Sequence, residues 1–218
     1  KGLRNHDGGR TLNIILESFR ETGYDVHTQL LDSADFGTAQ SRERIYIVAF
    51  RKDLDSSFFS FPEGKDRSAC IEDILENNPV SVRYYLSDHY LRSLRKHRER
   101  HSAQGHGFGY IVLDPKGKSH ALVCGGMGRE RNLVKDMRLE DFTPVTNIQG
   151  AVNREGIRNM TPREWARLQG FPDTFRLDAV SDTQLYKQLG NSVTIPVISA
   201  IAERIRDVLE KNCQGSEV

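Results

Sequence analysis

The sequence lacks long apolar runs, clustered cysteines and any excess of one charge. No stretch approaches the ~18 consecutive apolar residues that a membrane-spanning helix requires, so we expect no membrane partner. The three cysteines, Cys70, Cys124 and Cys213, are far apart and odd in number. That spacing fits neither a disulfide framework nor a zinc knuckle and favours a reducing compartment. With 31 Lys and Arg against 30 Asp and Glu, the chain is no polycation, but this balance does not exclude a local basic face.

The length and composition of the chain are those of an ordinary folded protein. Its 218 residues allow one large domain or two small ones. Hydrophobic residues make up 37% and charged residues 28%, which is enough apolar material for a core and too mixed for a disordered chain. The chain opens Lys-Gly-Leu without Met and without a signal or transit peptide. We therefore expect a processed or truncated piece of a longer protein.

The first third alternates between helical and extended patterns. Apolar residues spaced i, i+3, i+4, i+7 over 12–19 predict an amphipathic helix, which Gly23 ends. Two β-rich runs follow, at 25–31 and 45–50. The second run is almost wholly apolar and is predicted to be buried on both faces.

The middle, from about residue 53 to 159, has no steady period. Its basic segment 90–100 predicts a helix, and glycine-rich segments 105–110 and 125–131 predict loops with polar and basic tips. A strand is predicted between them, over 110–113. This texture differs from both flanks and indicates a functional module inserted into one folded body.

The last third is regular again. Thr161-Pro162-Arg163-Glu164 is a capping box that predicts a helix ending at Gly170. A second helix is predicted from Ser181 to Gly190. A third begins at Pro196, with one apolar face formed by Ile198, Ile201, Ile205 and Leu209.

Three segments combine residue types that carry chemistry. In 40–44, Gln-Ser-Arg-Glu-Arg, the two arginines would share one face of an extended chain, suited to a phosphate or a carbonyl oxygen, or would form only a surface patch. Segment 158–173 can be explained as a capped helix with a hard stop. Segment 186–197 contains a Gly-Asn-Ser turn that could hold a small polar ligand. Each alone is a weak signal.

Together and in this order, the three segments resemble blocks of the cytosine-5 DNA methyltransferases. They resemble the eighth, ninth and tenth sequence blocks of that family, and Lys1-Gly2-Leu3 resembles the end of the sixth. The likeness covers roughly 1–52 and 158–208. The variable stretch between them lies where the family keeps its target-recognition domain.

The resemblance implies roles for individual residues. Arg44 resembles the arginine that holds the flipped cytosine at its O2 atom, Arg42 its phosphate-contacting companion, and Gln40 a residue that shapes the same loop. Asn191 and Ser192 resemble residues that approach S-adenosylmethionine near its carboxylate end. The helix at Thr161 resembles a strut that organises the recognition domain and performs no chemistry.

The reaction that the family performs explains these residue types. A cysteine thiolate adds to C6 of the cytosine, and the resulting enamine takes the methyl group from S-adenosylmethionine. A carboxyl group and an arginine stabilise charge at N3 and O2, and the nucleotide must first leave the base stack.

Three features of the family are missing from the chain. It has no Pro-Cys nucleophile pair, no Glu-Asn-Val block and no glycine-rich cofactor loop. We therefore expect it to be inactive without an N-terminal half, supplied by the same polypeptide or by a separate subunit. A non-catalytic DNA-binding specificity subunit of a split methyltransferase, and a helical DNA-binding module unrelated to methylation, stay open as alternatives.

The middle module offers candidate contacts to double-stranded DNA. The basic helix is interpreted either as a solvated surface or as a set of phosphate contacts. Arginines on the second glycine loop suit the O6 and N7 atoms of guanine. No metal site is expected, because no cysteine pair or carboxylate cluster accompanies the histidines. The candidate DNA-binding residues are Arg92, Arg95, Lys96, Arg98, Arg129 and Arg131.

The fold expected from the resemblance is α/β. It would be the C-terminal part of a doubly wound, Rossmann-like methyltransferase sheet with an inserted, irregular and β-rich target-recognition domain. The expected divisions are 1–58 for the catalytic part, 59–157 for target recognition, and 158–218 for the strut and the helices returning to the catalytic part. The resemblance also implies a bacterial, cytoplasmic, DNA-associated protein of a restriction-modification system.

Overall fold

The computed structural model describes residues 2–107, 109–146 and 148–214 and divides the chain into two compact units. The first consists of Lys1–Gly37, Arg42–Arg67 and Thr194–Val218, and the second of Thr38–Ser41 and Ser68–Val193. The second unit is thus inserted into the sequence of the first. In the part of the chain that is described, no helix is long and apolar enough to cross a bilayer.

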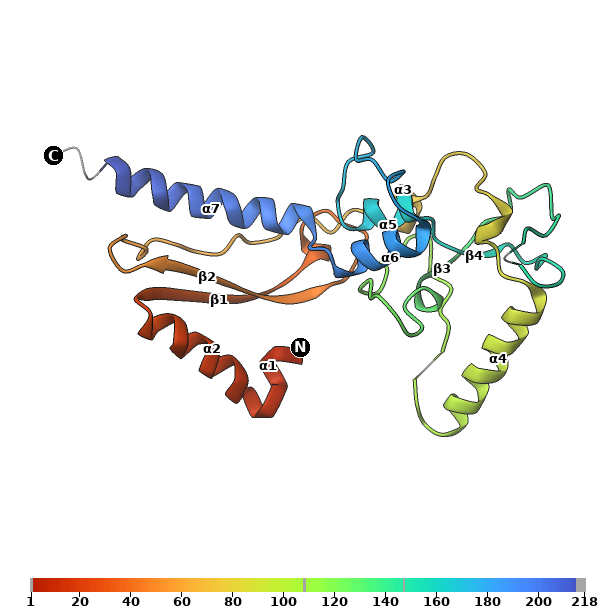
Figure 1. Ribbon diagram of the computed structural model, residues 1–218, viewed down its shortest axis with the longest axis horizontal. Coiled ribbons are helices and arrows are strands. Elements are labelled where there is room, and N and C mark those ends of the chain that lie inside the picture. The colour runs from red at the N-terminus through yellow and green to blue at the C-terminus, as the bar shows by residue number, and fades with distance from the viewer. Residues whose placement is uncertain (1, 108, 147, 215–218) are drawn as a thin grey trace. The chain divides into compact units, whose positions relative to one another are not determined.

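The first unit is built on an antiparallel pair of strands. β1 (Tyr24–Asp32) pairs with β2 (Glu43–Arg51) along their whole length, with Tyr24 opposite Arg51 and Asp32 opposite Glu43. Helix α7 (Ile195–Gln214) lies along one side of this pair and α2 (Arg10–Glu21) along the other (Figure 1). The short α1 (Gly2–Asn5) precedes α2. The predicted helix, both strands and the C-terminal helix are confirmed.

The core of this unit lies between the strand pair and α7. Leu31, Val48 and Phe50 are buried there. α2 contributes no buried residue, so the opposite face of the strands is only partly covered. The prediction that β2 is buried on both faces is therefore wrong, because Ile45 and Ile47 stay half-buried. Further apolar side chains that complete this core are Phe59, Phe61, Val197, Ile201 and Val208.

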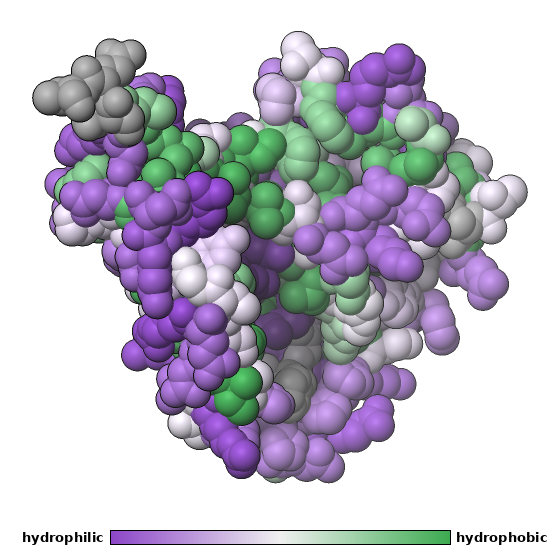
Figure 2. Space-filling view, turned by 60° about the vertical axis from the view of Figure 1, so that its left-hand side comes forward, coloured by the Kyte–Doolittle hydropathy of each residue, from purple (hydrophilic) through white to green (hydrophobic). Residues whose placement is uncertain are grey.

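The second unit has mostly short elements joined by long irregular segments. Figure 2 shows a mostly hydrophilic surface on which hydrophobic residues are also exposed. Its helices and strands are α3 (Ile71–Ile74), α4 (Asp88–Ala103), β3 (Leu133–Lys135), β4 (Ile157–Asn159), α5 (Pro162–Leu168) and α6 (Asp182–Asn191).

These elements confirm three predicted helices and correct the predicted strand content. α4 and α5 lie where the basic segment and the capping box predict them, and α6 matches the helix predicted from Ser181 to Gly190. The expectation of a β-rich module is wrong for the described residues, because β3 and β4 are three-residue strands paired with each other. The strand predicted over 110–113 is reduced to a single bridge between Val112 and Leu133. Side-chain contacts between irregular segments and helices, rather than a sheet, hold this unit together.

The compact units do not follow the divisions expected from the resemblance. They change at 37/38, 41/42, 67/68 and 193/194, whereas the expected divisions fall at 58/59 and 157/158. Segment 158–193 packs with the irregular middle because α5 and α6 share one apolar cluster with Leu113, Leu122 and Val134. The functional division of the chain stays a prediction. Phe108, in the first glycine-rich segment, lies outside the described residues.

A buried network of charges holds the second unit together. The Arg158 side chain is fully buried, and its guanidinium donates to both carboxylate oxygens of Glu164 at 2.7 and 2.8 Å. It also donates to Asp136 Oδ2 at 3.0 Å. Arg138 reaches the same Asp136 carboxylate from its other side, at 2.8 and 2.9 Å. Two arginines and two carboxylates thus neutralise one another where little water enters.

The same glutamate closes the start of α5. Thr161 Oγ1 accepts a hydrogen bond from the Glu164 amide, and Glu164 Oε2 accepts one from the Thr161 amide at 2.8 Å. Glu164 Oε1 also accepts from the backbone N–H of Glu76 at 3.1 Å. The predicted capping box is therefore confirmed, and its acidic residue serves the helix and the charge network together.

The charge network predicts how stability of the second unit depends on pH. Arg138, and then Arg158, hold the pKa of Asp136 well below its ordinary value of about 3.9. A carboxyl whose pKa is lower in the folded state stabilises that state above the unfolded pKa, and the contribution is lost as pH falls. The stability difference between wild type and Asp136→Asn should therefore be largest near neutral pH and shrink from about pH 4 downward.

Urea unfolding followed by fluorescence tests this, because Trp165 is the single tryptophan and lies in the core of this unit. Asp178→Asn is the matched control, since the Asp178–Arg176 pair is exposed. It should change the unfolding midpoint little at any pH. A difference between wild type and Asp136→Asn that does not depend on pH would contradict the assignment.

Candidate functional site

Two arginines with like charge lie together at the start of β2. Arg44 is half-buried, and its guanidinium donates to the carbonyl of Glu43 at 2.8 Å. The Arg42 side chain is buried, and that burial together with the charge of Arg44 lowers the pKa of Arg42 to about 10. Adjacent cations in a partly dehydrated place form a site that favours an anion or a developing negative charge.

The backbone around Arg42 is fixed by the turn that follows β1. Asp32 Oδ1 accepts hydrogen bonds from the N–H of Arg42 at 2.7 Å and from the N–H of Ala34 at 3.1 Å. The N–H of Ser33 donates to the carbonyl of Arg42 at 3.3 Å. These bonds hold the residues before β2 in a defined conformation, which orients the arginine pair.

Gln40 belongs to the second unit and is fully buried. Its Nε2 donates to the carbonyl of Leu168 at 3.0 Å and to Gln169 Oε1 at 3.1 Å. Its Oε1 accepts from the N–H of Leu122 at 2.8 Å. Gln40 therefore joins α5 to the segment before the second glycine loop, and its amide is committed to structural bonds.

Asn191 and Ser192 lie at the end of α6. Asn191 is exposed, and its Oδ1 accepts a hydrogen bond from the Cys124 thiol at 2.9 Å. No acceptor for Asn191 Nδ2 is found among the described residues. The neighbouring Ser192 adds a half-buried hydroxyl, which also bonds the carbonyl of Val193 at 3.3 Å. An amide donor beside a hydroxyl fits a carboxylate, so these two residues suit the amino-acid end of S-adenosylmethionine.

The basic helix α4 presents its charges outward. Leu91 and Leu94 are buried in the second unit, while Arg92 and Lys96 are exposed on the other faces of the helix. Arg95 pairs with Glu155 at 2.6 Å. Arg98 lies over the ring of Tyr110, 5.5 Å from its centre. The four candidate phosphate contacts thus divide into two exposed cations, one paired cation and one stacked cation.

The two arginines proposed for guanine contacts occupy different surroundings. Arg129 lies over the ring of Tyr186, with its guanidinium carbon 5.2 Å from the ring centre. Arg131 is exposed, two residues further along in a short 3₁₀ turn. Burial, and then the charge of Arg131, lower the pKa of His120. Arg129 immediately precedes the turn that contains Arg131, so the two lie on one segment but in different surroundings.

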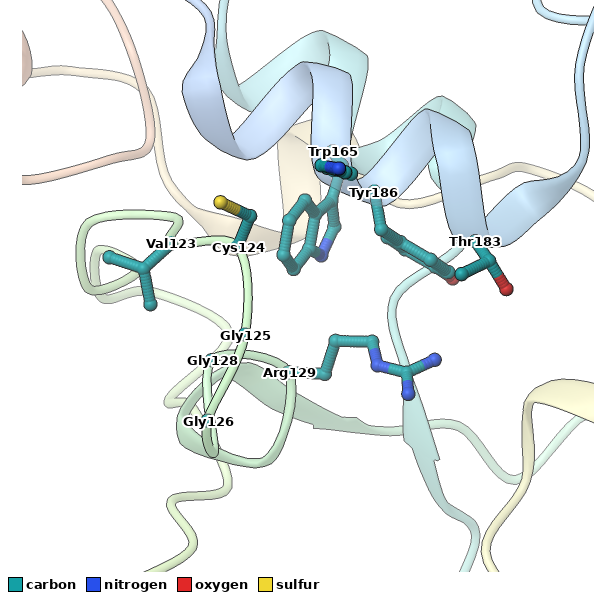
Figure 3. Close-up of a pocket in the computed structure, with 10 residues that line it drawn as sticks. Val123, Cys124, Gly125, Gly126, Gly128, Arg129, Trp165, Thr183 and Tyr186 are labelled. Carbon is teal, nitrogen blue, oxygen red and sulfur yellow. The ribbon is translucent and has the colours of Figure 1, made fainter.

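A cavity that the sequence patterns do not predict lies beside Arg129. Its volume is about 390 Å³. Figure 3 shows Trp165 and Tyr186 projecting from α5 and α6 on one side and the glycine-rich segment on the other. The lining residues are Val123, Cys124, Gly125, Gly126, Gly128, Arg129, Trp165, Thr183, Tyr186 and Lys187. The single tryptophan and the Gly125-Gly126 pair are the sequence features that mark this cavity, but about forty residues separate them, so the sequence does not show that they meet.

One group of possible metal ligands occurs among the residues described. Cys70, Glu72 and Asp73 have ligand atoms close together. Asp73, however, accepts hydrogen bonds from the Cys70 amide at 2.7 Å and from its thiol at 3.2 Å, which caps α3. Glu72 pairs with Lys116. Internal bonds account for this cluster, and the expectation of no metal site stays a prediction.

Comparisons with known proteins agree on one family. The model of the family described as C-5 cytosine-specific DNA methylase matches residues 1–207. The type II methyltransferase M.HpaII of Haemophilus parainfluenzae is 54% identical over 211 residues, which cover 96% of this chain and 59% of the relative. M.NlaX of Neisseria lactamica is 38% identical over 210 residues, covering 96% and 61%. The chain thus spans about three fifths of the length of these relatives.

Solved structures agree on the fold. The Entamoeba histolytica methyltransferase EhMeth has a TM-score of 0.66 at 22% identity, covering 91% of this chain and 58% of that one. S. pombe Dnmt2 has a TM-score of 0.65 at 18% identity, covering 96% and 65%. Likeness at such low identity establishes the mixed α/β methyltransferase fold, as the sequence predicts.

The bond between Cys124 and Asn191 predicts a change in thiol reactivity. Because the Cys124 thiol is held by Asn191 Oδ1 at 2.9 Å, an alkylating reagent must displace this contact before it reaches the sulfur. Asn191→Ala should raise the alkylation rate of Cys124 by iodoacetamide about two- to fivefold, which corresponds to losing one weak hydrogen bond. Cys213, exposed on α7, is the internal control and should react at an unchanged rate. Equal Cys124 rates in wild type and variant, measured by mass spectrometry, would show that the bond is absent.

Proposed function

Since the chain belongs to the family of C-5 cytosine-specific DNA methylases, we propose that it is the C-terminal portion of a DNA (cytosine-5-)-methyltransferase. In this function it holds the flipped cytosine, reads the DNA target and completes the S-adenosylmethionine site. The observation that carries the proposal is the Arg42–Arg44 pair, two like charges fixed at the start of β2.

Arg44 is the residue proposed to touch the reacting base. Its side chain is half-buried, so part of the guanidinium can donate to the cytosine O2 while its strand fixes its position. Negative charge develops on the N3–C2–O2 side of the ring when a nucleophile adds to C6. A guanidinium placed there before the reaction stabilises that charge without reorganising. The nucleophilic cysteine and the N3 carboxyl group would come from an N-terminal half.

Arg42 is proposed to bind a phosphate of the flipped nucleotide. Burial and the charge of Arg44 disfavour its protonated form, as its lowered pKa indicates. A bound phosphate would favour the protonated form of Arg42 again, because its negative charge is attracted to both arginines. Arg42 therefore contributes to binding the extrahelical nucleotide and to keeping Arg44 near the base.

Asn191 and Ser192 are proposed to contact S-adenosylmethionine. That molecule supplies the methyl group when it is bound. The Asn191 amide would donate to the carboxylate of the cofactor, and the Ser192 hydroxyl would add a second polar contact. Most of the cofactor pocket is proposed to lie on the N-terminal half, because the glycine-rich loop of the family is missing from this chain.

The second unit is proposed to read DNA. Arg92 and Lys96 are exposed on α4 and suit phosphate contacts, with Arg95 and Arg98 beside them on the same helix. Arg131, exposed on the second glycine-rich segment, suits a guanine edge in the major groove. The relatives named type II methyltransferases support action on bacterial DNA in the cytoplasm, within a restriction-modification system.

Transfer of labelled methyl groups to duplex DNA tests the proposal. The chain alone should be inactive, and mixing it with an N-terminal half of a close relative should restore transfer. In that mixture Arg44→Ala should lower the rate about a hundredfold or more, the usual effect of removing one preorganised charge donor. Arg51→Ala is the matched control, because Arg51 ends the same strand in an exposed pair with Asp53. It should keep most of the activity.

Each remaining outcome separates the alternatives. Activity from the chain alone would contradict the need for a second half. A mixture that binds DNA but never transfers methyl groups would favour the non-catalytic specificity subunit. A mixture in which Arg44→Ala and Arg51→Ala behave alike would remove Arg44 from the catalytic site.

A further inference from the structure

The cavity beside Arg129 lies wholly within the second unit, and of its lining residues only Arg129 has been given a binding role above. All ten of its lining residues belong to that unit. Its volume of about 390 Å³ falls within the range of sites that take small ligands. Arg42, Arg44, Asn191 and Ser192 are not among its lining residues. The cavity is therefore distinct from the residues proposed to bind the cytosine and S-adenosylmethionine.

The most informative group in the cavity is the indole of Trp165. This side chain is 1% exposed, and its Nε1–H has no hydrogen-bond acceptor among the residues described. Figure 3 shows the indole nitrogen directed toward the space between Tyr186 and Arg129. The indole N–H is thus a donor that an acceptor atom entering the cavity could meet.

The other polar groups at the cavity are also donors. The Arg129 guanidinium lies over the Tyr186 ring and pairs with no carboxylate in the described chain. Lys187 is exposed and likewise lacks an ion pair there. Thr183 adds a hydroxyl, and no Asp or Glu is among the lining residues. Several N–H and O–H donors with no acidic neighbour select an anion with oxygen acceptors.

The remaining walls suit an apolar, flat group attached to that anion. Gly125 and Gly126 have φ angles of +93° and +55°, so the segment turns with left-handed backbone that only glycine adopts readily. Gly128 has no room for a side chain, since an added Cβ would lie 2.4 Å from the carbonyl oxygen of Val123. The glycine wall is therefore bare backbone. Tyr186, whose hydroxyl bonds the Met160 carbonyl at 2.6 Å, presents ring rather than polar surface.

We propose that this cavity binds one nucleotide unit, with its phosphate at Trp165, Arg129 and Lys187 and its base along the glycine wall. The shared chemistry is a 5′-phosphate bearing a nucleobase. It could be a free mononucleotide or an unpaired nucleotide of a DNA strand. Binding here needs no methyl transfer and is separate from the target cytosine held by Arg44.

The single tryptophan reports on the cavity directly. The chain is titrated with deoxyguanosine monophosphate while Trp165 fluorescence and heat are recorded in parallel. Saturable binding with a change in Trp165 emission is expected, whereas deoxyguanosine and inorganic phosphate should each bind at least about tenfold more weakly. Equal binding of inorganic phosphate, or no heat and no emission change at millimolar nucleotide, would overturn the proposal.

Two substitutions locate the site without disturbing the core. Arg129→Gln and Lys187→Gln, both at exposed positions, should each weaken nucleotide binding about tenfold, as expected for loss of a charged hydrogen bond. Lys135→Gln removes an exposed positive charge of the same unit outside the cavity and should change the affinity less than about twofold. Equal effects of Arg129→Gln and Lys135→Gln would mean general electrostatic attraction and would overturn the site.

Competition then identifies the source of the nucleotide. A duplex carrying one unpaired, bulged nucleotide should displace the bound mononucleotide if the cavity takes a nucleotide from DNA. A fully paired duplex of the same sequence serves as the control. Displacement by the bulged duplex alone assigns the cavity to DNA. If neither duplex displaces the mononucleotide, the cavity is assigned to a free mononucleotide.

Discussion

Arg158 carries its charge where water does not reach, and the second unit is organised around the neutralisation of that charge. A lone buried guanidinium would be strongly unfavourable, so its two carboxylate partners are structural necessities. Glu164 meets it with two parallel hydrogen bonds, the geometry that a guanidinium matches best. Asp136, shared with Arg138, supplies the rest of the compensation. The pair fixes β4 and the start of α5 with respect to each other.

Further positions in the unit depend on that orientation of α5. Trp165 follows Glu164 directly and meets Tyr186 edge to face, with ring centres 4.9 Å apart. Tyr186 in turn supports Arg129, and Gln169 bonds the carbonyl of Leu189 at 2.7 Å. The placement of α6, of the cavity and of Asn191 therefore follows from the helix that Glu164 caps. A helix that resembles a strut by sequence thus also contributes Trp165 to the wall of the cavity.

The sequence predicts local features well because their causes are local. The capping box of α5 needs only Thr161 and Glu164, three residues apart, and the apolar spacing of α2 lies within a dozen residues. The family resemblance likewise rests on short segments, and the family comparison confirms it. The face of β2 that stays half-buried could not be foreseen, because its cover depends on how α2 packs.

Long-range features escaped the sequence for the same reason. Asp136 lies 22 residues before Arg158, with no motif that links them. The cavity joins residues near 125, 165 and 185, which only the fold brings together. The prediction that the middle is β-rich was also wrong, since apolar side chains there are buried although the backbone that carries them is irregular. The sequence shows which charged and aromatic residues occur in these regions, but only the fold shows which of them contact one another.

A double-mutant cycle on Arg158 and Glu164 tests the central role of the buried pair most directly. Unfolding in urea is followed by Trp165 fluorescence for wild type, Arg158→Met, Glu164→Met and the double variant. Arg158→Met leaves the buried Glu164 carboxylate without its cation, and Glu164→Met leaves Arg158 with Asp136 as its one carboxylate partner among the described residues. Each single substitution should cost about 3–5 kcal/mol, while the double variant should cost clearly less than their sum. Single effects that are small and strictly additive would show that the second unit does not depend on this pair.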